Sequence, residues 1–187
     1  GLLVGVTCWR MLLKRASLMP GESVLVVGSG GGVNSLSILM AKAIGAEVLV
    51  LCGTKEKAEK VRSLGVHSVI NYADTPRWDV EVLRLTRGRG VDVVVDNVGA
   101  KTIPMSLRAV RRGGRIVTVG NTSGHDVTYD NRLLFTKQVS LLGSTMGSTQ
   151  DFITAMQYLW NNNVRPIVDR VSPLQDGIKA IEKLERG

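Results

Sequence analysis

The chain has 187 residues, of which 44% are hydrophobic and 21% charged, and its net charge is +8. This composition is typical of one folded domain with a sizeable core, and it excludes a disordered or low-complexity chain. No apolar run is long enough to span a membrane, so we expect no membrane-embedded segment. Lysine and arginine are scattered along the chain and only 4% of residues are aromatic, which argues against a nucleic-acid partner.

Cys8 and Cys52 are the only cysteines. Two cysteines are too few for a disulfide framework, and they lack the paired spacing of a zinc site. We therefore expect two free, buried thiols in a cytoplasmic protein.

The predicted elements begin with a helix over residues 2–18, which the sequence Met19-Pro20-Gly21-Glu22 ends. Strand-like runs and helical patterns then alternate, which is typical of a parallel sheet with helical crossovers. The strands are nearly continuous in Val, Leu and Ile, as in strands covered by helices on both faces. The pattern predicts a doubly wound α/β fold in three layers, with strands at 23–28, 47–53, 67–72, 91–99, 114–121 and 139–145, and helices near 33–45, 55–64, 78–87 and 101–111.

Beyond the sixth strand, Ser148 and Asp151 have the spacing of a capping box, which predicts a helix that runs through Trp160. A short strand near Val168 and an amphipathic helix from Leu174 to Leu184 are expected after it.

Small residues at 28–32, Gly-Ser-Gly-Gly-Gly, lie between the first strand and the next helix. In this context free backbone N–H groups and the positive end of the helix can bind a pyrophosphate. No register of the G-x-G-x-x-G fingerprint is complete, because Val33, Asn34 or Ser35 takes the place of the last glycine. A plain turn without a ligand is the alternative interpretation.

The second strand ends in Cys52, Gly53 and Thr54, with lysines at positions 55 and 57, where an NAD-binding unit usually has an acidic residue for the ribose hydroxyls. Methyltransferases that use S-adenosylmethionine usually need an acid there too. A hydroxyl and ammonium groups suit a 2′-phosphate, which a carboxylate would repel. We therefore expect a preference for NADP(H) over NAD(H), unless these lysines only solvate the first turn of a helix.

The stretch from Val24 to Tyr72, with "GRGVDVVVDNVG", "GGRIVTVGNTSG" and "LLGSTMGS", resembles the coenzyme-binding domain of medium-chain dehydrogenases/reductases. Within that superfamily it is most similar to quinone oxidoreductases and zinc-type alcohol dehydrogenase-like proteins. The resemblance implies a Rossmann fold over residues 21–187, ending before a final strand. It also implies that residues 1–20 are a helix linking this domain to an N-terminal substrate domain that the chain does not contain.

The resemblance also implies roles for single residues, most of them at the carboxyl ends of successive strands. It places Thr7 near the nicotinamide, and it places Thr54 and Lys57 at the 2′-phosphate, with Tyr72 near the adenosine. The remaining residues that it assigns to the coenzyme are Ser29, Gly30, Gly31, Gly32, Val33 and Asn34 at the pyrophosphate, and Gly53, Asn97, Gly99, Gly120, Asn121, Thr122, Ser144, Thr145, Met146 and Gly147 elsewhere in the site.

Zinc-dependent members of the superfamily have a cysteine ligand four residues before the threonine that Thr7 matches, and this chain has Leu3 there. His67 and His125 stand alone in the sequence, as surface histidines do. We expect no metal site in this chain and a zinc-independent enzyme.

The resemblance implies hydride transfer between NADP(H) and a quinone, enone or alcohol/carbonyl substrate that is bound with the help of the other domain. No residue here is predicted as a general acid or base, and the isolated domain is expected to be inactive. A zinc-dependent alcohol dehydrogenase, an enoyl reductase, and a non-catalytic cofactor-binding relative remain as alternatives. Members usually associate through an edge strand such as 138–144, so a homodimer is expected.

Overall fold

The computed structural model describes residues 2–186, with side chains to residue 183, and its strands form one parallel sheet. The strand order is β3-β2-β1-β4-β5-β6, which confirms the predicted doubly wound fold. The strands are β1 (Ser23–Val27), β2 (Glu47–Cys52), β3 (Ser68–Asn71), β4 (Val91–Asp96), β5 (Val110–Thr118) and β6 (Ser140–Gly143).

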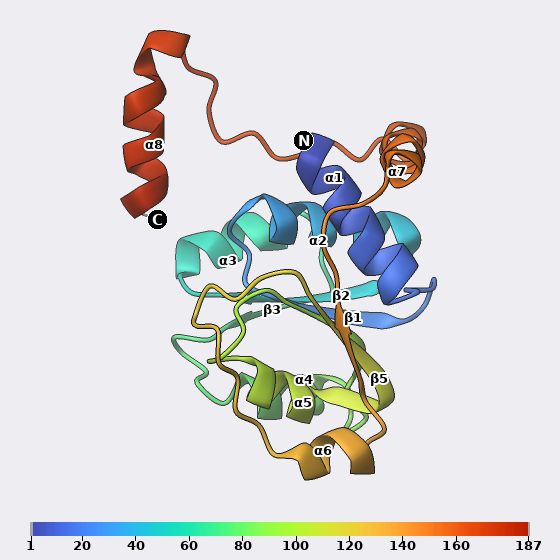
Figure 1. Ribbon diagram of the computed structural model, residues 1–187. Coiled ribbons are helices and arrows are strands. Elements are labelled where there is room, and N and C mark those ends of the chain that lie inside the picture. The colour runs from blue at the N-terminus through green and yellow to red at the C-terminus, as the bar shows by residue number, and fades with distance from the viewer. Residues whose placement is uncertain (1, 187) are drawn as a thin grey trace.

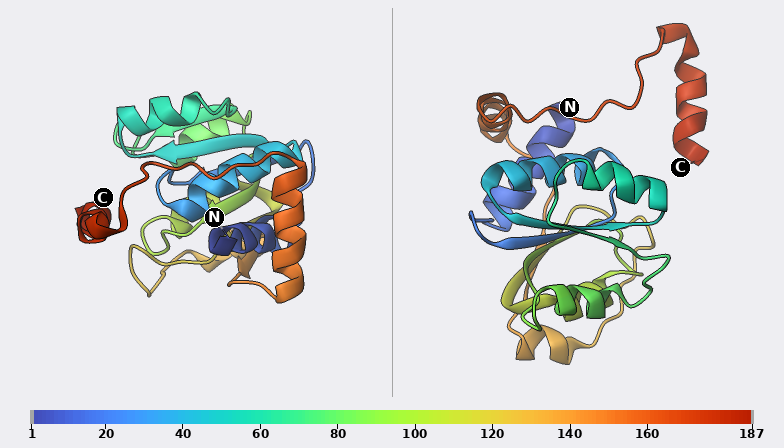
Figure 2. Two further views of the ribbon diagram at one scale, coloured as in Figure 1. Left: turned by 90° about the horizontal axis from the view of Figure 1, so that it is seen from above. Right: turned by 180° about the vertical axis from the view of Figure 1, so that it is seen from behind.

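Helices cover both faces of the sheet (Figure 1). One face carries α1 (Leu2–Trp9), the π-helix η1 (Arg10–Arg15), α2 (Gly32–Ile44), α3 (Lys55–Arg62) and α7 (Thr149–Asn161), and the other carries α4 (Trp78–Leu85), α5 (Ile103–Ala109) and α6 (Asn131–Thr136). After α7 the chain runs extended to η2 (Leu174–Asp176) and α8 (Gly177–Arg186), which lies apart from the body in both views of Figure 2. None of the helices within residues 2–186 is long and apolar enough to cross a bilayer.

The core consists of two apolar layers, one on each side of the sheet. In β1, Val24 and Val26 pack into the layer below α1, α2 and α7, while Leu25 and Val27 pack into the layer with α4 and α5. This alternation explains why every residue of β1 is buried and why the strand is apolar from Val24 to Val27.

The outlying elements differ from the predictions. The helix expected over 2–18 is α1 followed by η1, and β5 begins at Val110 because Val110 pairs with Val91 before the register shifts. The helix α6 was not predicted, because its six residues are too few to carry a helical period. The prediction of a strand near Val168 is wrong. Residues 164–173 pair with no strand among residues 2–186, and Val168 is 68% exposed.

The first helical segment packs into the same core as the sheet. Cys8, Met11 and Leu12 are fully buried in the layer with β1 and α2, and α1 contacts both α2 and α7. The boundary between residues 1–20 and 21–187 as separate parts of a larger enzyme stays a prediction.

At the amino edge of the sheet, Asp92 joins β4 to β1 and to two arginines. Its carboxylate accepts hydrogen bonds from the backbone N–H and hydroxyl of Ser23, each at 2.8 Å, and from Arg89 and Arg111 at 2.6 and 2.5 Å. Burial by itself raises the pKa of Asp92, but these hydrogen bonds outweigh it and hold that pKa well below its usual range.

We predict that Asp92→Asn lowers the free energy of unfolding at neutral pH by about 2–3 kcal/mol, because Arg89 and Arg111 lose their charged partner. The pKa of Asp92 is lower in the folded than in the unfolded state. The stabilisation by its carboxylate is therefore fully present above pH ~4 and is lost as the pH falls from there through the folded-state pKa. Urea unfolding at pH 7 and pH 3 should show the difference between variant and wild type shrinking in acid. Asp74→Asn, at an exposed carboxylate that contacts Asn71, is the control; a difference that is the same at both pH values would contradict the account.

Candidate coenzyme-binding site

The strand order reverses between β1 and β4, and doubly wound sheets bind ligands in the crevice at the carboxyl ends of such a pair. The glycine turn lies at that point. It leaves β1 at Val27, and Gly31 has a φ of +74° as the residue that precedes α2. A side chain there would be strained, so glycine allows the chain to enter the helix directly from the strand.

The backbone of this turn is open toward a ligand. The N–H groups of Gly30, Gly31, Gly32 and Val33 have no hydrogen-bond acceptor among the described residues. No atom lies within 4 Å of the position of a Cβ on Gly30 or Gly31. Free donors at the start of a 13-residue helix, with empty space beside them, fit the pyrophosphate of a dinucleotide.

The end of β2 has no carboxylate, as the sequence indicates, and Tyr72 lies over Gly53. A Cβ on Gly53 would overlap the phenol oxygen of Tyr72, so the ring can lie in this position only over a residue without a side chain. Thr54 caps α3 by accepting a hydrogen bond from the Lys57 N–H at 3.2 Å. The exposed side chain of Lys57 has no ion pair among residues 2–183.

The ends of β4 and β5 pack directly against each other. A Cβ on Gly120 would lie 3.1 Å from the carbonyl oxygen of Asn97, and one on Gly99, whose φ is +91°, would lie 3.2 Å from Cα of Asn121. Asn121 is exposed and its Nδ2 lies 2.7 Å from Nδ1 of His125. Four of the predicted site residues thus form one compact wall.

Asp96, at the end of β4, organises this wall and was not predicted. It is fully buried, and its carboxylate accepts hydrogen bonds from the N–H groups of Val98 and Gly99 at 3.0 and 3.2 Å, and from the hydroxyls of Thr102 and Ser106 at 2.7 Å each. It therefore fixes the turn into α5. An acid at the end of a strand, followed by N–H groups and hydroxyls at short range, is the signal that could have identified it.

Beyond β6, the hydroxyl of Ser144 is buried and has no hydrogen-bond partner within the described part of the chain. A buried hydroxyl cannot form the hydrogen bond that it would form with water, so a polar atom of a ligand would supply the missing partner of Ser144. Thr145 and Met146 are exposed beside it. A Cβ on Gly147 would lie 2.5 Å from Val6, so the segment after β6 lies against α1.

Thr7 lies on α1, and its hydroxyl donates to the carbonyl of Leu3 at 3.0 Å. The next residue, Cys8, is buried. Its burial raises the pKa of the thiol to about 11, despite a hydrogen bond from Ser37. Cys52 is buried as well and also not in a disulfide, and burial raises its pKa. Both thiols are therefore in the form that packs and does not react.

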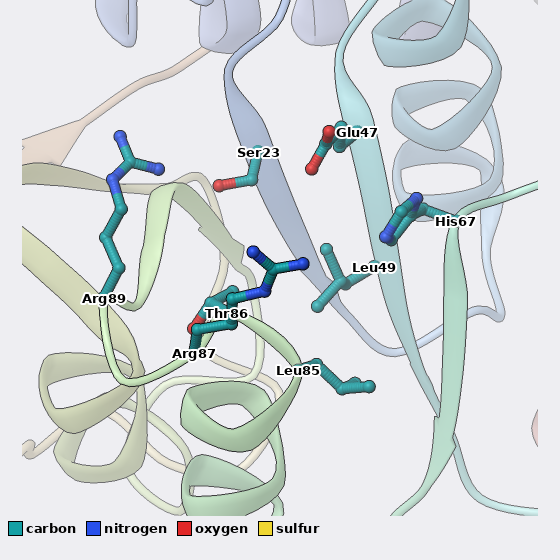
Figure 3. A pocket seen from close by; sticks show the side chains of 8 residues that line it. All are labelled: Ser23, Glu47, Leu49, His67, Leu85, Thr86, Arg87 and Arg89. Atoms are coloured by element: carbon teal, nitrogen blue, oxygen red, sulfur yellow. The ribbon is translucent and has the colours of Figure 1, made fainter.

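A cavity of about 310 Å³ lies at the opposite, amino edge of the sheet (Figure 3). Ser23 and Glu47, which begin β1 and β2, line it together with His67, which lies beside Glu47, and with Arg87 and Arg89 from the segment after α4. Its charged walls are exposed, and the glycine turn lies at the other end of β1. The carboxyl edge, where the free N–H groups are, is therefore the candidate coenzyme site.

His67 and His125 lie at opposite edges of the sheet, and among the described residues no three His, Cys, Asp or Glu side chains gather as metal ligands. The expectation that this chain binds no metal stays a prediction.

The family model described as zinc-binding dehydrogenase matches residues 32–161. The chain belongs to the zinc-binding dehydrogenase family. This match, the sheet topology and the comparisons below confirm the resemblance to the coenzyme-binding domain of medium-chain dehydrogenases/reductases.

Three relatives illustrate the family. The NAD-dependent alcohol dehydrogenase of Saccharolobus solfataricus is 32% identical over 97% of this chain and 52% of its own length. The crotonyl-CoA reductase of Streptomyces collinus is 27% identical over 98% of this chain and 45% of its own. A solved structure of the 2-octenoyl-CoA carboxylase reductase CinF, in complex with NADP and 2-octenoyl-CoA, is 30% identical and has a TM-score of 0.89 over 100% of this chain and 46% of that one. The chain thus spans about half the length of the relatives it matches.

We predict that Gly99→Ala lowers the free energy of unfolding by about 1–3 kcal/mol, because its backbone has a positive φ and its Cβ would press on Asn121. Gly30→Ala, where a Cβ meets nothing, should change it by less than about 0.5 kcal/mol. Thermal or urea unfolding of both variants measures this. Equal stability of the two variants would contradict the packing of the β4 and β5 ends described above.

Proposed function

We propose that the chain is the coenzyme-binding domain of an NADP(H)-dependent oxidoreductase that transfers a hydride to or from a quinone, an enone or an alcohol/carbonyl substrate. The observation that carries the proposal is the open glycine turn at the β1–β4 crevice, next to a β2 end that has cations and no carboxylate. The family membership supports the use of a nicotinamide coenzyme.

The preference for NADP(H) rests on the charges around Thr54. Glu56 is the acidic residue of the first turn of α3, and it pairs with Lys60 at 2.8 Å. Lys55 and Lys57 have no such partner among residues 2–183, so the net charge beside Gly53 is positive. The Thr54 hydroxyl accepts from Lys57 N–H and keeps its own hydrogen for a phosphate oxygen. Relatives differ in this respect: one is named NAD-dependent, and CinF was solved with NADP.

In the proposed enzyme, the nicotinamide ring supplies the hydride chemistry, and the protein supplies binding, orientation and exclusion of water. The N–H groups of Gly30 to Val33 would hold the pyrophosphate, and the region of Gly120 to Thr122 and Ser144 would hold the nicotinamide end. A conjugated acceptor needs less polarisation than a simple carbonyl. The relatives named crotonyl-CoA reductase support an enone-type substrate, and those named alcohol dehydrogenase support the alternative of an alcohol.

We propose a second domain as partner, because apolar side chains on α1 and α8 are exposed. Leu2 and Leu3 are 63% and 60% exposed, and Ile178 and Ile181 are 73% and 59% exposed. Exposed apolar side chains of this kind favour contact with another part of a polypeptide. A domain corresponding to the half of the relatives that this chain does not match could make that contact. The isolated domain would then bind coenzyme without turnover.

We also propose a homodimer in the cytoplasm. The strand β6 is at the edge of the sheet, and Leu141 on it is 40% exposed, so a second copy could pair with this edge. Two buried thiols that are not in a disulfide suit a reducing compartment.

We predict that Lys57→Ala weakens NADPH binding by about tenfold or more, because a charge-assisted hydrogen bond to the 2′-phosphate is lost. NADH binding should be unchanged. Isothermal titration calorimetry with both nucleotides measures this. Lys14→Ala, which removes an exposed lysine of η1, is the matched control and should leave both affinities as they are. Tighter binding of NADH than of NADPH by the wild-type chain would contradict the proposed preference.

A further inference from the structure

We infer that Asn34 is a positioning residue: together with Asn97 it forms a side-chain bridge that aligns the pyrophosphate turn with the nicotinamide end of the site. The inference rests on the proposed function, which it extends by assigning a role to the residue that replaces the last glycine of the fingerprint.

The bridge is a chain of three hydrogen bonds that joins β1, β4 and β5. Asn34 Nδ2 donates to the carbonyl of Val27 at 3.1 Å, and Asn97 Nδ2 donates to Asn34 Oδ1 at 3.1 Å. The backbone N–H of Val119 then donates to Asn97 Oδ1 at 2.9 Å. The carbonyl at one end accepts only and the N–H at the other donates only, so both amides have a single possible orientation.

The bridge replaces a contact that the fingerprint makes without a side chain. The last glycine normally lets the helix pack closely on the strand. Here the Asn34 amide lies between α2 and β1, and a Cβ on Gly28 would come within 3.0 Å of its Nδ2. Gly28 and Asn34 are therefore matched to each other. The same turn of α2 is held from α1 by the Cys8 thiol, which donates to the Val33 carbonyl at 3.3 Å.

Asn97 also contacts the loop after β5, and it thereby fixes the position of this loop relative to Asn34. Its carbonyl accepts from the Thr122 N–H at 3.4 Å and lies 3.1 Å from the position of a Cβ on Gly120. The side-chain amide of Asn97 thus bonds to Asn34 and Val119, and its role is to hold the site in position. The first turn of α2 and residues 120–122 cannot shift independently while these bonds are intact. They belong to the pyrophosphate part and the nicotinamide part of the proposed dinucleotide site.

The test compares NADPH with 2′-phospho-ADP-ribose, which has the adenosine half and both bridging phosphates but no nicotinamide. Calorimetry on the full 187-residue chain should show that Asn34→Gly weakens NADPH binding by about tenfold, although it restores the glycine of the fingerprint. Binding of 2′-phospho-ADP-ribose should weaken clearly less. Asn97→Ala should have the same effect, and the double variant Asn34→Gly/Asn97→Ala should lose no more than either single variant.

The matched control is Asn162→Ala, which removes an asparagine hydrogen bond to the Tyr158 carbonyl at the end of α7 and should leave both affinities unchanged. Equal losses for NADPH and the fragment, or additive losses in the double variant, would overturn the inference and leave the proposed function intact. Failure of the wild-type chain to bind either nucleotide would overturn the proposed function and the inference with it. An increase in NADPH affinity in Asn34→Gly would also overturn the inference.

Discussion

The end of β1 is the constraint on which the rest of the site depends. β1 is buried on both faces and lies between β2 and β4. The polypeptide that follows β1 therefore leaves the sheet at the carboxyl edge. The turn into α2 must be short, and it leaves the first N–H groups of a long helix without partners. Those donors bind an anion well, and the neighbouring strand ends, with Gly53 and Tyr72 on one side and Asn97 and Gly120 on the other, complete the surroundings of the turn.

The two edges of the sheet carry different polar groups. Near the amino edge, Asp92 is buried and pairs with Arg89 and Arg111. In the first turn of α4, Asp79 is also buried and pairs with Arg77 and Arg108. These four arginines and two carboxylates account for +2 of the net charge of +8, and this part of the positive charge belongs to the fold. At the carboxyl edge the polar groups are different: free N–H groups, the Ser144 hydroxyl and the Lys57 ammonium have no partners in the described chain. The buried Ser144 hydroxyl costs stability while it has no partner, and all of these groups can bind a polar or anionic ligand.

The sequence was sufficient for the features that depend on local pattern. The runs of Val and Leu in β1, β2 and β4 predicted buried parallel strands, and Ser148 with Asp151 predicted the capping box that begins α7. Features that depend on contacts between distant segments could not be predicted. The hydrogen bond from Asn97 to Asn34 joins residues 63 positions apart, and the pairing of Val91 with Val110 extends β5 beyond its apolar run. The apolar residues near Val168 resemble a strand, but they pair with no strand among residues 2–186.

The most direct test of the central claim is a titration of the ¹⁵N-labelled chain with NADPH, followed by the backbone amide resonances. The account predicts that the largest shifts occur at Gly30 to Asn34 and at Gly53 to Lys57, at the carboxyl edge of the sheet. Shifts confined to Glu47, His67 and Arg87 at the amino edge, or no shifts at all, would contradict it.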